Sequence, residues 1–362
     1  MRIALINSRE DVAGVNIRHH LEILLAEGGE WPLANRHTLT FCEVGGRLIY
    51  QDRIDEEVDA DLIIFISRHA SAQPMPALTV HVTGNYETAD LGGEPETLAP
   101  AAPAWMHAVL RNLAARAPEG YRVSYEVTHH GPTALRTPSL FVEIGSTATE
   151  WADPVAGRAV AESMLSAVPE ETINFIGFGG THYAMRQTEI ALSSRGAFGH
   201  IAPARQIGFL DPGLIQQMRE ASCAVAAYID RKSLPADEVR RIERMLDDAG
   251  VLLLTESEIL EAAGLAWASY LRVRSLVGEI APGSRVHIHD LAGGGTPVAV
   301  RVSPDLVEET VKIDKVGFLA ALDKLPVAHL SKGSTEVVPT FITFEEMSSQ
   351  LARDITTLCV KL

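Results

Sequence analysis

The chain has 362 residues, of which 46% are hydrophobic and 22% are charged, so it can fold around a sizeable core and is not of the disordered class. Its net charge of −16 at pH 7 argues against a protein that coats nucleic acid, because phosphate neutralisation needs clustered lysine and arginine. A nucleic acid bound through a local basic patch stays possible. Residues 1–231 contain no lysine, so phosphate contacts there fall to arginine, histidine or backbone N–H groups.

The cysteines and the length of the apolar runs indicate the cellular compartment of the protein. The three cysteines are widely spaced and odd in number, which predicts neither a disulfide framework nor a cysteine-based zinc site. The apolar runs are far too short to cross a bilayer, and the opening MRIALINSRED does not have the pattern of a signal peptide. We expect a cytoplasmic monomer with no membrane partner.

Strand-like and helix-like segments alternate over residues 1–231. The predicted strands include RIALINS, DLIIFISRHA, PALTVHVTGN, YRVSYEVTHHG, SLFVEIGS and TINFIGFGG, and the predicted helices include residues 15–28, 101–120 and 153–168. TEIALSSRGAFGHI predicts two more strands, and GLIQQMREASCAVAAYIDR predicts one helix. This alternation is typical of an α/β domain, and we expect three layers built on one mixed sheet.

A shift in composition marks the remaining residues. All lysines lie at Lys232 or beyond, which favours a domain boundary near residue 231 and a smaller α+β module over residues 232–362. Within it, RVHIHDLAGGGTPVAVRVS predicts a hairpin. Its alternating histidines, His287 and His289, are expected on one solvated face of a strand.

Polar residues gather where the predicted strands end. In open α/β sheets, ligands bind beyond the carboxyl ends of the strands. If the predicted strands are neighbours in one sheet, these side chains converge on one edge. They are Arg68, His69, His81, Asn85, His129, His130, His182 and His200.

Each of these residues also has a purely structural interpretation. A single histidine near a strand end is more often a hydrogen-bonded structural residue than a ligand. Glu143 can pair with Arg68 or Arg136, and the glycines of GFGG can serve only to permit a positive φ. Considered together, a histidine and carboxylate cluster without cysteines suits zinc or a similar metal, which activates water for hydrolysis. The HExxH spacing and the nucleotide-binding glycine motifs are absent from the sequence.

Three long stretches carry a resemblance to a known family. THHGPTALRTPSLFVEIGS (128–146), GFGGTHYAMRQTEIAL (177–192) and GAFGHI (196–201) resemble the archaeal and plant type of D-aminoacyl-tRNA deacylase. ISRHAS, PALTVHVTGN and DVAGVNI are similar to that family as well, so the likeness covers about residues 1–205. It implies a zinc-dependent hydrolase that cleaves the ester between a D-amino acid and the 3′ end of tRNA. It also implies a fold like those of phosphorylases and peptidyl-tRNA hydrolases.

Individual roles follow from the residues rather than from the family. His130, His182 and His81 are the leading zinc ligands, and Glu143 is expected as base or carboxylate ligand. Neighbours on an extended strand face opposite ways, so His129 and His130 cannot both face one metal unless the strand has ended there. His129 is therefore expected either to hold a metal ligand in place or to orient the water.

The other candidates concern a second metal and the substrate. His200 and Glu189 are candidates for a second zinc ion. Arg68 and Arg136 are expected at the terminal phosphates, with His69 and Asn85 also near the substrate. Thr181 and the backbone of Gly179 and Gly180 are expected at the oxyanion or the terminal ribose. An acidic protein that grips only the single-stranded acceptor end needs few phosphate contacts, which predicts modest affinity with shallow salt dependence.

Three alternatives remain at this point. The first is a metal hydrolase or amidase of small molecules, which explains the histidines and the charge equally well. The second is an enzyme like the nucleoside phosphorylases, for which only Arg68 is a well-placed phosphate ligand. The third is a binding module without catalysis, in which the histidines are structural.

Overall fold

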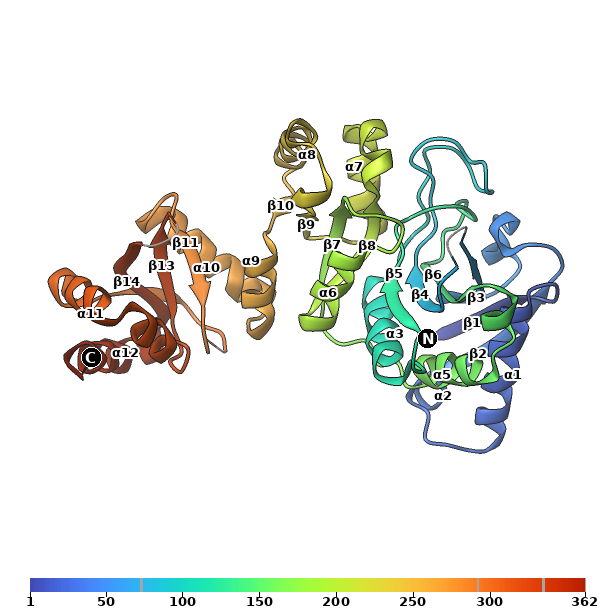
Figure 1. Ribbon diagram of the computed structural model, residues 1–362, viewed down its shortest axis with the longest axis horizontal. Coiled ribbons are helices and arrows are strands. Elements are labelled where there is room, and N and C mark those ends of the chain that lie inside the picture. Colours follow the sequence, from blue (N-terminus) through green and yellow to red (C-terminus); the bar gives the residue numbers. More distant parts are fainter. Residues whose placement is uncertain (72–73, 292, 334–335, 362) are drawn as a thin grey trace. The chain divides into compact units, whose positions relative to one another are not determined.

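The structure is a computed structural model that describes residues 1–71, 74–291, 293–333 and 336–361. The chain divides into two units, Met1–Leu254 and Thr255–Leu362 (Figure 1). The division lies later than the predicted boundary near residue 231, because helix α8 (Ala236–Asp248) buries Val239, Ile242 and Leu246 in a core of the first unit. The many charged residues of α8 had suggested that this helix belongs to the second unit.

A six-stranded mixed sheet forms the first half of the first unit. Its strands are β1 (Arg2–Ser8), β2 (Thr38–Val44), β3 (Leu62–Ala70), β4 (Ala77–His81), β5 (Arg122–Tyr125) and β6 (Ser139–Ser146). The order is β2-β1-β3-β6-β4-β5. Strands β1, β2, β3 and β6 are parallel, whereas β4 runs antiparallel to β6 and parallel to β5. The near-continuous apolar sequences of β3 and β6 fit their burial in the centre of the sheet.

Helices cover one side of this sheet, as Figure 1 shows for α1 (Val12–Ala26), α2 (Pro32–Arg36) and α5 (Pro154–Leu165). Helix α1 begins at Asp11, whose Oδ1 accepts the backbone N–H of Gly14 at 3.0 Å, and it buries a face that includes Ile17 and Leu21. Helix α3 (Pro103–Arg116) packs on β4 and also on β8 of a second sheet. Short α4 (Ala148–Trp151) follows β6.

The second sheet of this unit is parallel and four-stranded. Its strands are β7 (Ile173–Phe178), β8 (Gly196–Ala202), β9 (Ala226–Ile229) and β10 (Leu252–Leu253), in the order β10-β9-β7-β8. The α/β class is therefore confirmed, but the expected single sheet is two sheets. Residues predicted as a strand pair form α6 (Met185–Ser193) followed by β8, and the helix predicted after Gly213 is α7 (Pro212–Ala221) followed by β9.

The second unit contains a four-stranded antiparallel sheet with its own core. Strands β11 (Arg285–Ile288), β12 (Pro297–Arg301), β13 (Ala328–Lys332) and β14 (Glu336–Phe344) lie in the order β11-β13-β14-β12. The helices are α9 (Glu256–Glu261), α10 (Trp267–Ile280), α11 (Pro304–Leu322) and α12 (Ser348–Lys361). No helix of the described residues is long and apolar enough to cross a membrane.

Two predictions about the second unit are wrong. Strands β11 and β12 occupy opposite edges of the sheet, so they form no hairpin. His287 and His289 do not face solvent together, because each ring stacks against buried His329, with ring centroids 4.6 and 4.9 Å apart. His289 is held further by Asp323, whose Oδ1 lies 2.6 Å from Nδ1.

Candidate active site

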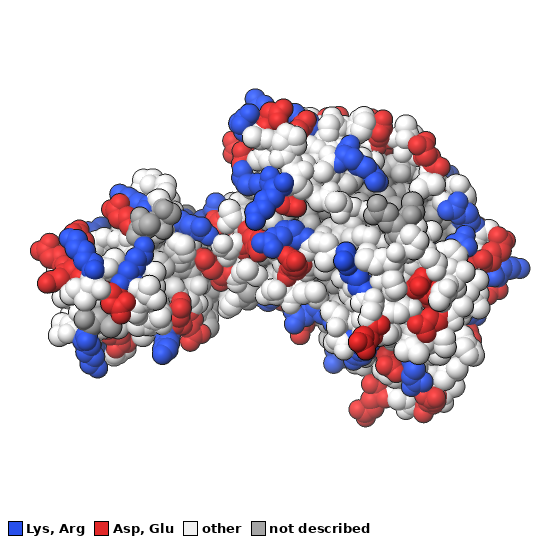
Figure 2. Space-filling model, in the orientation of Figure 1, with Lys and Arg blue, Asp and Glu red and all other residues white. Residues whose placement is uncertain are grey.

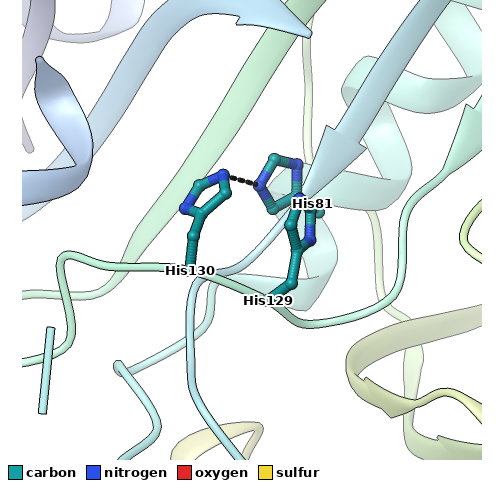
Figure 3. A group of neighbouring side chains, drawn as sticks. All are labelled: His81, His129 and His130. Carbon is teal, nitrogen blue, oxygen red and sulfur yellow. Dashed lines mark hydrogen bonds between the residues drawn. The ribbon is translucent and has the colours of Figure 1, made fainter. Parts of the chain in front are cut away.

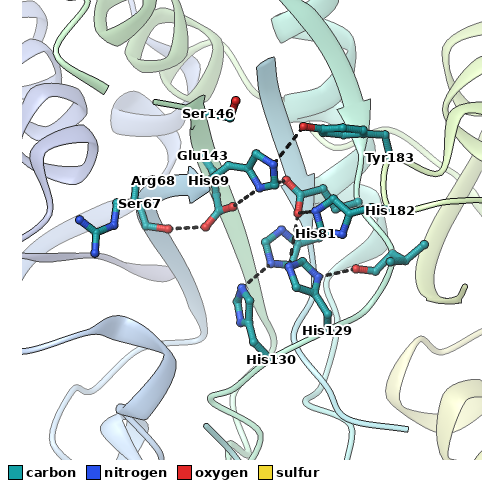
Figure 4. A network of polar contacts seen from close by, with 12 residues as sticks. Ser67, Arg68, His69, His81, His129, His130, Glu143, Ser146, His182 and Tyr183 are labelled. Carbon is teal, nitrogen blue, oxygen red and sulfur yellow. Dashed lines mark hydrogen bonds and ion pairs between the residues drawn. The ribbon is translucent and has the colours of Figure 1, made fainter. Parts of the chain in front are cut away.

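Polar side chains gather on one face of the six-stranded sheet, in β6 and in the last residues of β3 and β4. Glu143 of β6 pairs in register with Ser67 of β3 on one side and with Thr79 of β4 on the other. Residues two apart on a strand share a face, so His69 lies beside Ser67, and His81 lies beside Thr79. Polar side chains thus form a row on this face that runs across β3, β6 and β4 (Figure 4).

The expectation that these residues converge at the carboxyl edge of the sheet is wrong. Because β4 runs antiparallel to β6, its carboxyl end points away from the carboxyl end of β3. His69 pairs with Gly145, whereas His81 pairs with Phe141, so the two histidines flank the register position of Glu143. The cluster therefore combines residues on the face of the sheet, such as His69 and Glu143, with residues that follow strands, such as Glu126 after β5 and His182 after β7.

Glu126 is the centre of the cluster, and the sequence prediction missed it. This buried residue directly follows β5. Its Oε1 lies 3.0 Å from Nδ1 of His69, and its Oε2 lies 2.9 Å from Nε2 of His182 and 3.4 Å from Nε2 of His129. The available signal was a glutamate within the apolar stretch YEVT, three residues before His129.

The two buried carboxyl groups take opposite protonation states. Burial opposes ionisation of Glu126, but hydrogen bonds from His182 and His69 outweigh it and hold the pKa of this carboxyl well below its usual range. Burial and the nearby charge of Glu126 raise the pKa of Glu143 well above its usual range, although Ser67 Oγ donates to its Oε1 at 2.5 Å. Near neutral pH, an ionised Glu126 therefore lies near a protonated Glu143.

His81, His129 and His130 form a compact group (Figure 3). Strand β5 ends at Tyr125 and His130 has a φ of 46°, so the two adjacent histidines are no longer on an extended strand. Their ring centroids are 4.3 Å apart, and they lie 4.6 and 5.0 Å from the ring of His81. The expectation that only one of them faces the site is therefore wrong.

Backbone carbonyls fix the tautomers of His129 and His130. Nδ1 of His129 donates to the carbonyl oxygen of Val127 at 2.7 Å, and Nδ1 of His130 donates to that of Gly131 at 2.6 Å. A carbonyl oxygen only accepts, so the proton is on Nδ1 and each Nε2 is unprotonated and carries a lone pair. Nε2 of His130 lies 3.2 Å from Nε2 of His81. Metal-binding histidines have this arrangement, with one nitrogen held by a carbonyl and the other bare.

Desolvation keeps this histidine group neutral. It lowers the pKa of His130 to about 4 and holds the pKa of His81 and His129 well below the usual value for histidine. Neutral imidazole is the form that binds a metal ion. Three overlapping donor sets have their ligand atoms within 4.8 Å of one another: His81 with His129 and His130, His69 with Glu126 and His182, and His81 with Glu126 and Glu143.

Tyr183 is a second residue that the sequence prediction missed. Its hydroxyl lies 3.1 Å from Nε2 of His69, whose Nδ1 faces Glu126. Both ring nitrogens of His69 are thus engaged, and Tyr183 fixes its orientation (Figure 4). A cavity of about 530 Å³ opens onto the cluster and is lined by His69, His129, His130, Glu143 and His182 among others.

Several predicted residues lie apart from this cluster. His200 is buried, with Nε2 bonded to the carbonyl oxygen of Ala99 at 2.8 Å and Nδ1 to Oγ1 of Thr128 at 3.0 Å. Glu189 is exposed on α6 and pairs with Arg186 at 2.7 Å. The prediction of a second metal at His200 and Glu189 is therefore wrong.

The predicted substrate contacts are also partly displaced. The N–H groups of Gly179 and Gly180 donate to the carbonyl oxygen of Ala202 and to Oγ of Ser233, so neither is free for an oxyanion. Thr181 is exposed and does not line the cavity.

Asn85 and Arg136 do not line the cavity either. Nδ2 of Asn85 donates to the carbonyl oxygens of Gly92 and Glu94 and closes a loop. Arg136 is exposed, and its backbone N–H donates to Asp55. Of the predicted phosphate ligands, only Arg68 lines the cavity.

Fold and site together define an α/β protein with a buried histidine–glutamate cluster whose donors suit a metal ion. Residues 56–254 match the family model described as D-aminoacyl-tRNA deacylase. The D-aminoacyl-tRNA deacylase of Methanoculleus marisnigri is 76% identical over all of this chain and 83% of its own length. That of Methanoregula boonei is 53% identical over the same shares. The chain belongs to the D-aminoacyl-tRNA deacylase family, as the sequence motifs predicted.

Shorter relatives match only part of this chain. The D-aminoacyl-tRNA deacylase of Methanosarcina mazei is 40% identical over 73% of this chain and 95% of its own. The crystal structure of a conserved protein of unknown function is 34% identical, with a TM-score of 0.66, and covers 72% of this chain and 97% of its own. About a quarter of this chain therefore has no counterpart in these two relatives.

Proposed function

We propose that this protein hydrolyses the ester bond of D-aminoacyl-tRNA, releasing a D-amino acid and tRNA, with zinc held in the histidine–glutamate cluster. The observation that carries the proposal is the pair of unprotonated Nε2 atoms on His129 and His130, the first of which lies 3.4 Å from Oε2 of the anionic Glu126. The family supplies the substrate, and the donor chemistry supplies the metal. Arg68, which lines the cavity, is the proposed contact to the terminal phosphates.

The residues present fit a zinc ion. His81, His129 and His130 would hold it through imidazole nitrogens, and the set of His69, Glu126 and His182 would suit a second ion. When bound, zinc lowers the pKa of a water molecule and polarises an ester carbonyl. Glu126 would balance the positive charge of the ion, and it holds His182 and His69 in place through their ring nitrogens.

Glu143 is the proposed proton carrier. It lines the cavity, and near neutral pH it holds a proton that Ser67 helps to position. Glu143 gives this proton to the ribose oxygen as the ester C–O bond breaks, and it recovers one from the attacking water. The sum of these transfers is one water consumed and one acid and one alcohol released.

The proposal extends to the fold relationship, the cellular compartment and the oligomeric state. We propose that the first unit is related to the phosphorylase and peptidyl-tRNA-hydrolase folds, and that the protein is a cytoplasmic monomer. The mixed sheet with flanking helices supports the proposed fold relationship, and a tRNA substrate supports the cytoplasmic setting.

The decisive test is release of labelled D-tyrosine and L-tyrosine from charged tRNA, with and without a chelator. We expect release of D-tyrosine alone, its loss with the chelator, and its return when zinc is added back. Equal release of both amino acids, or of neither, contradicts the proposal. A folded protein that is active without metal contradicts the zinc site but not the substrate.

A further inference from the structure

Three arginines line the cavity beside the histidine–glutamate cluster, and two of them were not singled out by the sequence. Arg47 precedes the 3-10 helix Leu48–Tyr50, Arg68 belongs to β3, and Arg205 lies in the 3-10 helix Ala204–Phe209 after β8. Resting on the proposed function, we propose that Arg47, Arg68 and Arg205 form a clamp for consecutive phosphodiesters of the single-stranded tRNA acceptor end. We call these three residues the arginine clamp.

The arginine clamp takes part in no salt bridge within the part of the chain that the structure describes. Among the described residues, none of the three guanidinium groups has a carboxylate within ion-pair distance, unlike Arg18 and Arg158 of the same unit. Arginine offers a planar fork of donors that binds two phosphate oxygens at once. Three unpaired forks at one cavity therefore suit a ligand with several phosphate groups.

Aromatic rings support two of these guanidinium groups. Cζ of Arg47 lies 5.8 Å from the ring centroid of Tyr50, and Cζ of Arg68 lies 5.2 Å from that of Trp151. Trp151 is itself fixed, because its Nε1 donates to the carbonyl oxygen of His69 at 2.9 Å. Stacking on a ring engages the face of the guanidinium and leaves its N–H groups free at the edge. The supports thus pre-organise the donors for phosphate.

The clamp acts close to the site of chemistry. All three arginines line the same cavity as His129, His130 and Glu143. A phosphodiester on these arginines would therefore place the terminal ribose and its ester beside the histidine group.

Acidic residues of the same cavity restrict where phosphate can bind. Glu10 accepts the backbone N–H of Gly46 at 3.0 Å, and Asp11 accepts those of Gly14 and Arg68. These carboxylates would repel phosphate from the start of α1. The part of the cavity nearer the histidines would remain available for phosphate. Basic and acidic side chains are interspersed on the face drawn in Figure 2, so binding through a few local contacts fits this surface better than a broad basic one.

The test measures how the kcat/KM for D-tyrosyl-tRNA depends on salt. Each phosphate contact to a single strand contributes a slope of about −0.7 in log–log form, so the wild type should show a slope of about −2. Arg47→Ala and Arg205→Ala should each flatten the slope by about 0.7 and raise KM several-fold with little change in kcat. Arg47→Lys should keep the slope while raising KM. Arg36→Ala, an exposed arginine on α2, is the matched control and should leave both unchanged.

Binding of uncharged tRNA separates this proposal from the proposed function. Its salt slope should fall in the same variants even if the wild type releases no D-tyrosine, in which case only the proposed function fails. If the wild type is active but Arg47→Ala and Arg205→Ala keep its salt slope, the clamp is overturned. Inhibition by inorganic phosphate at the concentrations at which uncharged tRNA inhibits would also overturn it, since that result indicates a site for a small anion.

Discussion

At the scale of single residues, Glu126 and Glu143 differ in what surrounds them rather than in burial. Glu126 lies against His69 and His182, whereas the hydroxyl of Ser67 is the neighbour that donates to Glu143. Imidazole donors stabilise a carboxylate, and a buried carboxyl near another negative charge keeps its proton. One carboxyl is therefore suited to hold positive charge in the site, and the other is suited to carry a proton.

Glu126→Gln tests this division. The amide keeps the shape of the side chain but removes its charge, so we expect zinc content to fall at least tenfold and D-tyrosine release at least a hundredfold, with the fold kept. Metal analysis and circular dichroism of the purified variant check this. Glu22→Gln, an exposed change on α1, is the control for the removal of one charge. A zinc-loaded and active Glu126→Gln variant would contradict the role of Glu126.

His200 provides a prediction about pH. Burial lowers its pKa from 6.5 to about 4, so between these values the unfolded chain binds a proton that the folded protein does not. Stability should therefore fall as the pH is lowered through this window, by about 3 kcal/mol for this group alone. Denaturant unfolding at pH 7 and pH 4.5 should show a smaller decrease for His200→Gln than for the wild type. An identical decrease in both proteins would contradict the prediction.

The sequence predicted much of the site's composition but not its geometry. His81, His129, His130, His182 and Glu143 do cluster, because polar residues within apolar stretches are rarely accidental. Glu126 was missed because two of its partners, His69 and His182, lie far away in sequence. His200 was overestimated, because its two hydrogen bonds to Ala99 and Thr128 are tertiary contacts that no spacing reveals.

At the scale of elements, the direction of β4 decides where the site lies. A parallel β4 would carry His81 to the carboxyl edge, whereas the antiparallel strand leaves it on the sheet face beside β6. The alternation of strands and helices predicts the class but not the direction of a single strand. Likewise, the short apolar run of α6 fits a strand or a helix equally well, and packing decides between them.

The loop that begins after β4 borders the cavity through Leu91, and Gly92 lets it turn there. Gly92 has a φ of 84°, and a Cβ at this position would lie 2.0 Å from the carbonyl oxygen of Ile49. We expect Gly92→Ala to cost more than 2 kcal/mol and to raise KM, because the clash moves the loop. Gly120→Ala is the matched control, since Gly120 has a φ of 87° but nothing within 4 Å of the added Cβ. It should cost only about 1 kcal/mol, and equal costs in denaturant unfolding would contradict the prediction.

At the scale of the whole molecule, the two units have separate cores. One apolar cluster includes Ile176, Ile215 and Leu246, and another is formed by Phe318, Phe341 and other residues beyond position 299. D-aminoacyl-tRNA deacylases that match only 73% of this chain carry the family name as well. The first unit by itself contains every residue of the histidine–glutamate cluster.

Two truncations test the boundary. Residues 1–254 should fold alone and release D-tyrosine at close to the full rate. Residues 1–231 should be unfolded, because they lack α8 and with it Val239, Ile242, Met245 and Leu246. Burial of each such side chain is worth about 1.5–3 kcal/mol, so the loss approaches the whole stability of a typical domain. Thermal unfolding followed by circular dichroism distinguishes the outcomes, and a stable 1–231 fragment would restore the earlier boundary.

The position of His182 affects how this protein is made. His182 follows the first strand of the second sheet, and its carbonyl oxygen accepts the N–H of Val127, next to Glu126. A nascent chain that has left the ribosome only as far as β6 would hold Glu126 without one of its main partners. A buried carboxylate that lacks a partner is costly, so the six-stranded sheet should not close around it until the second sheet has emerged. We therefore expect the first sheet to be completed only after the second sheet has been translated.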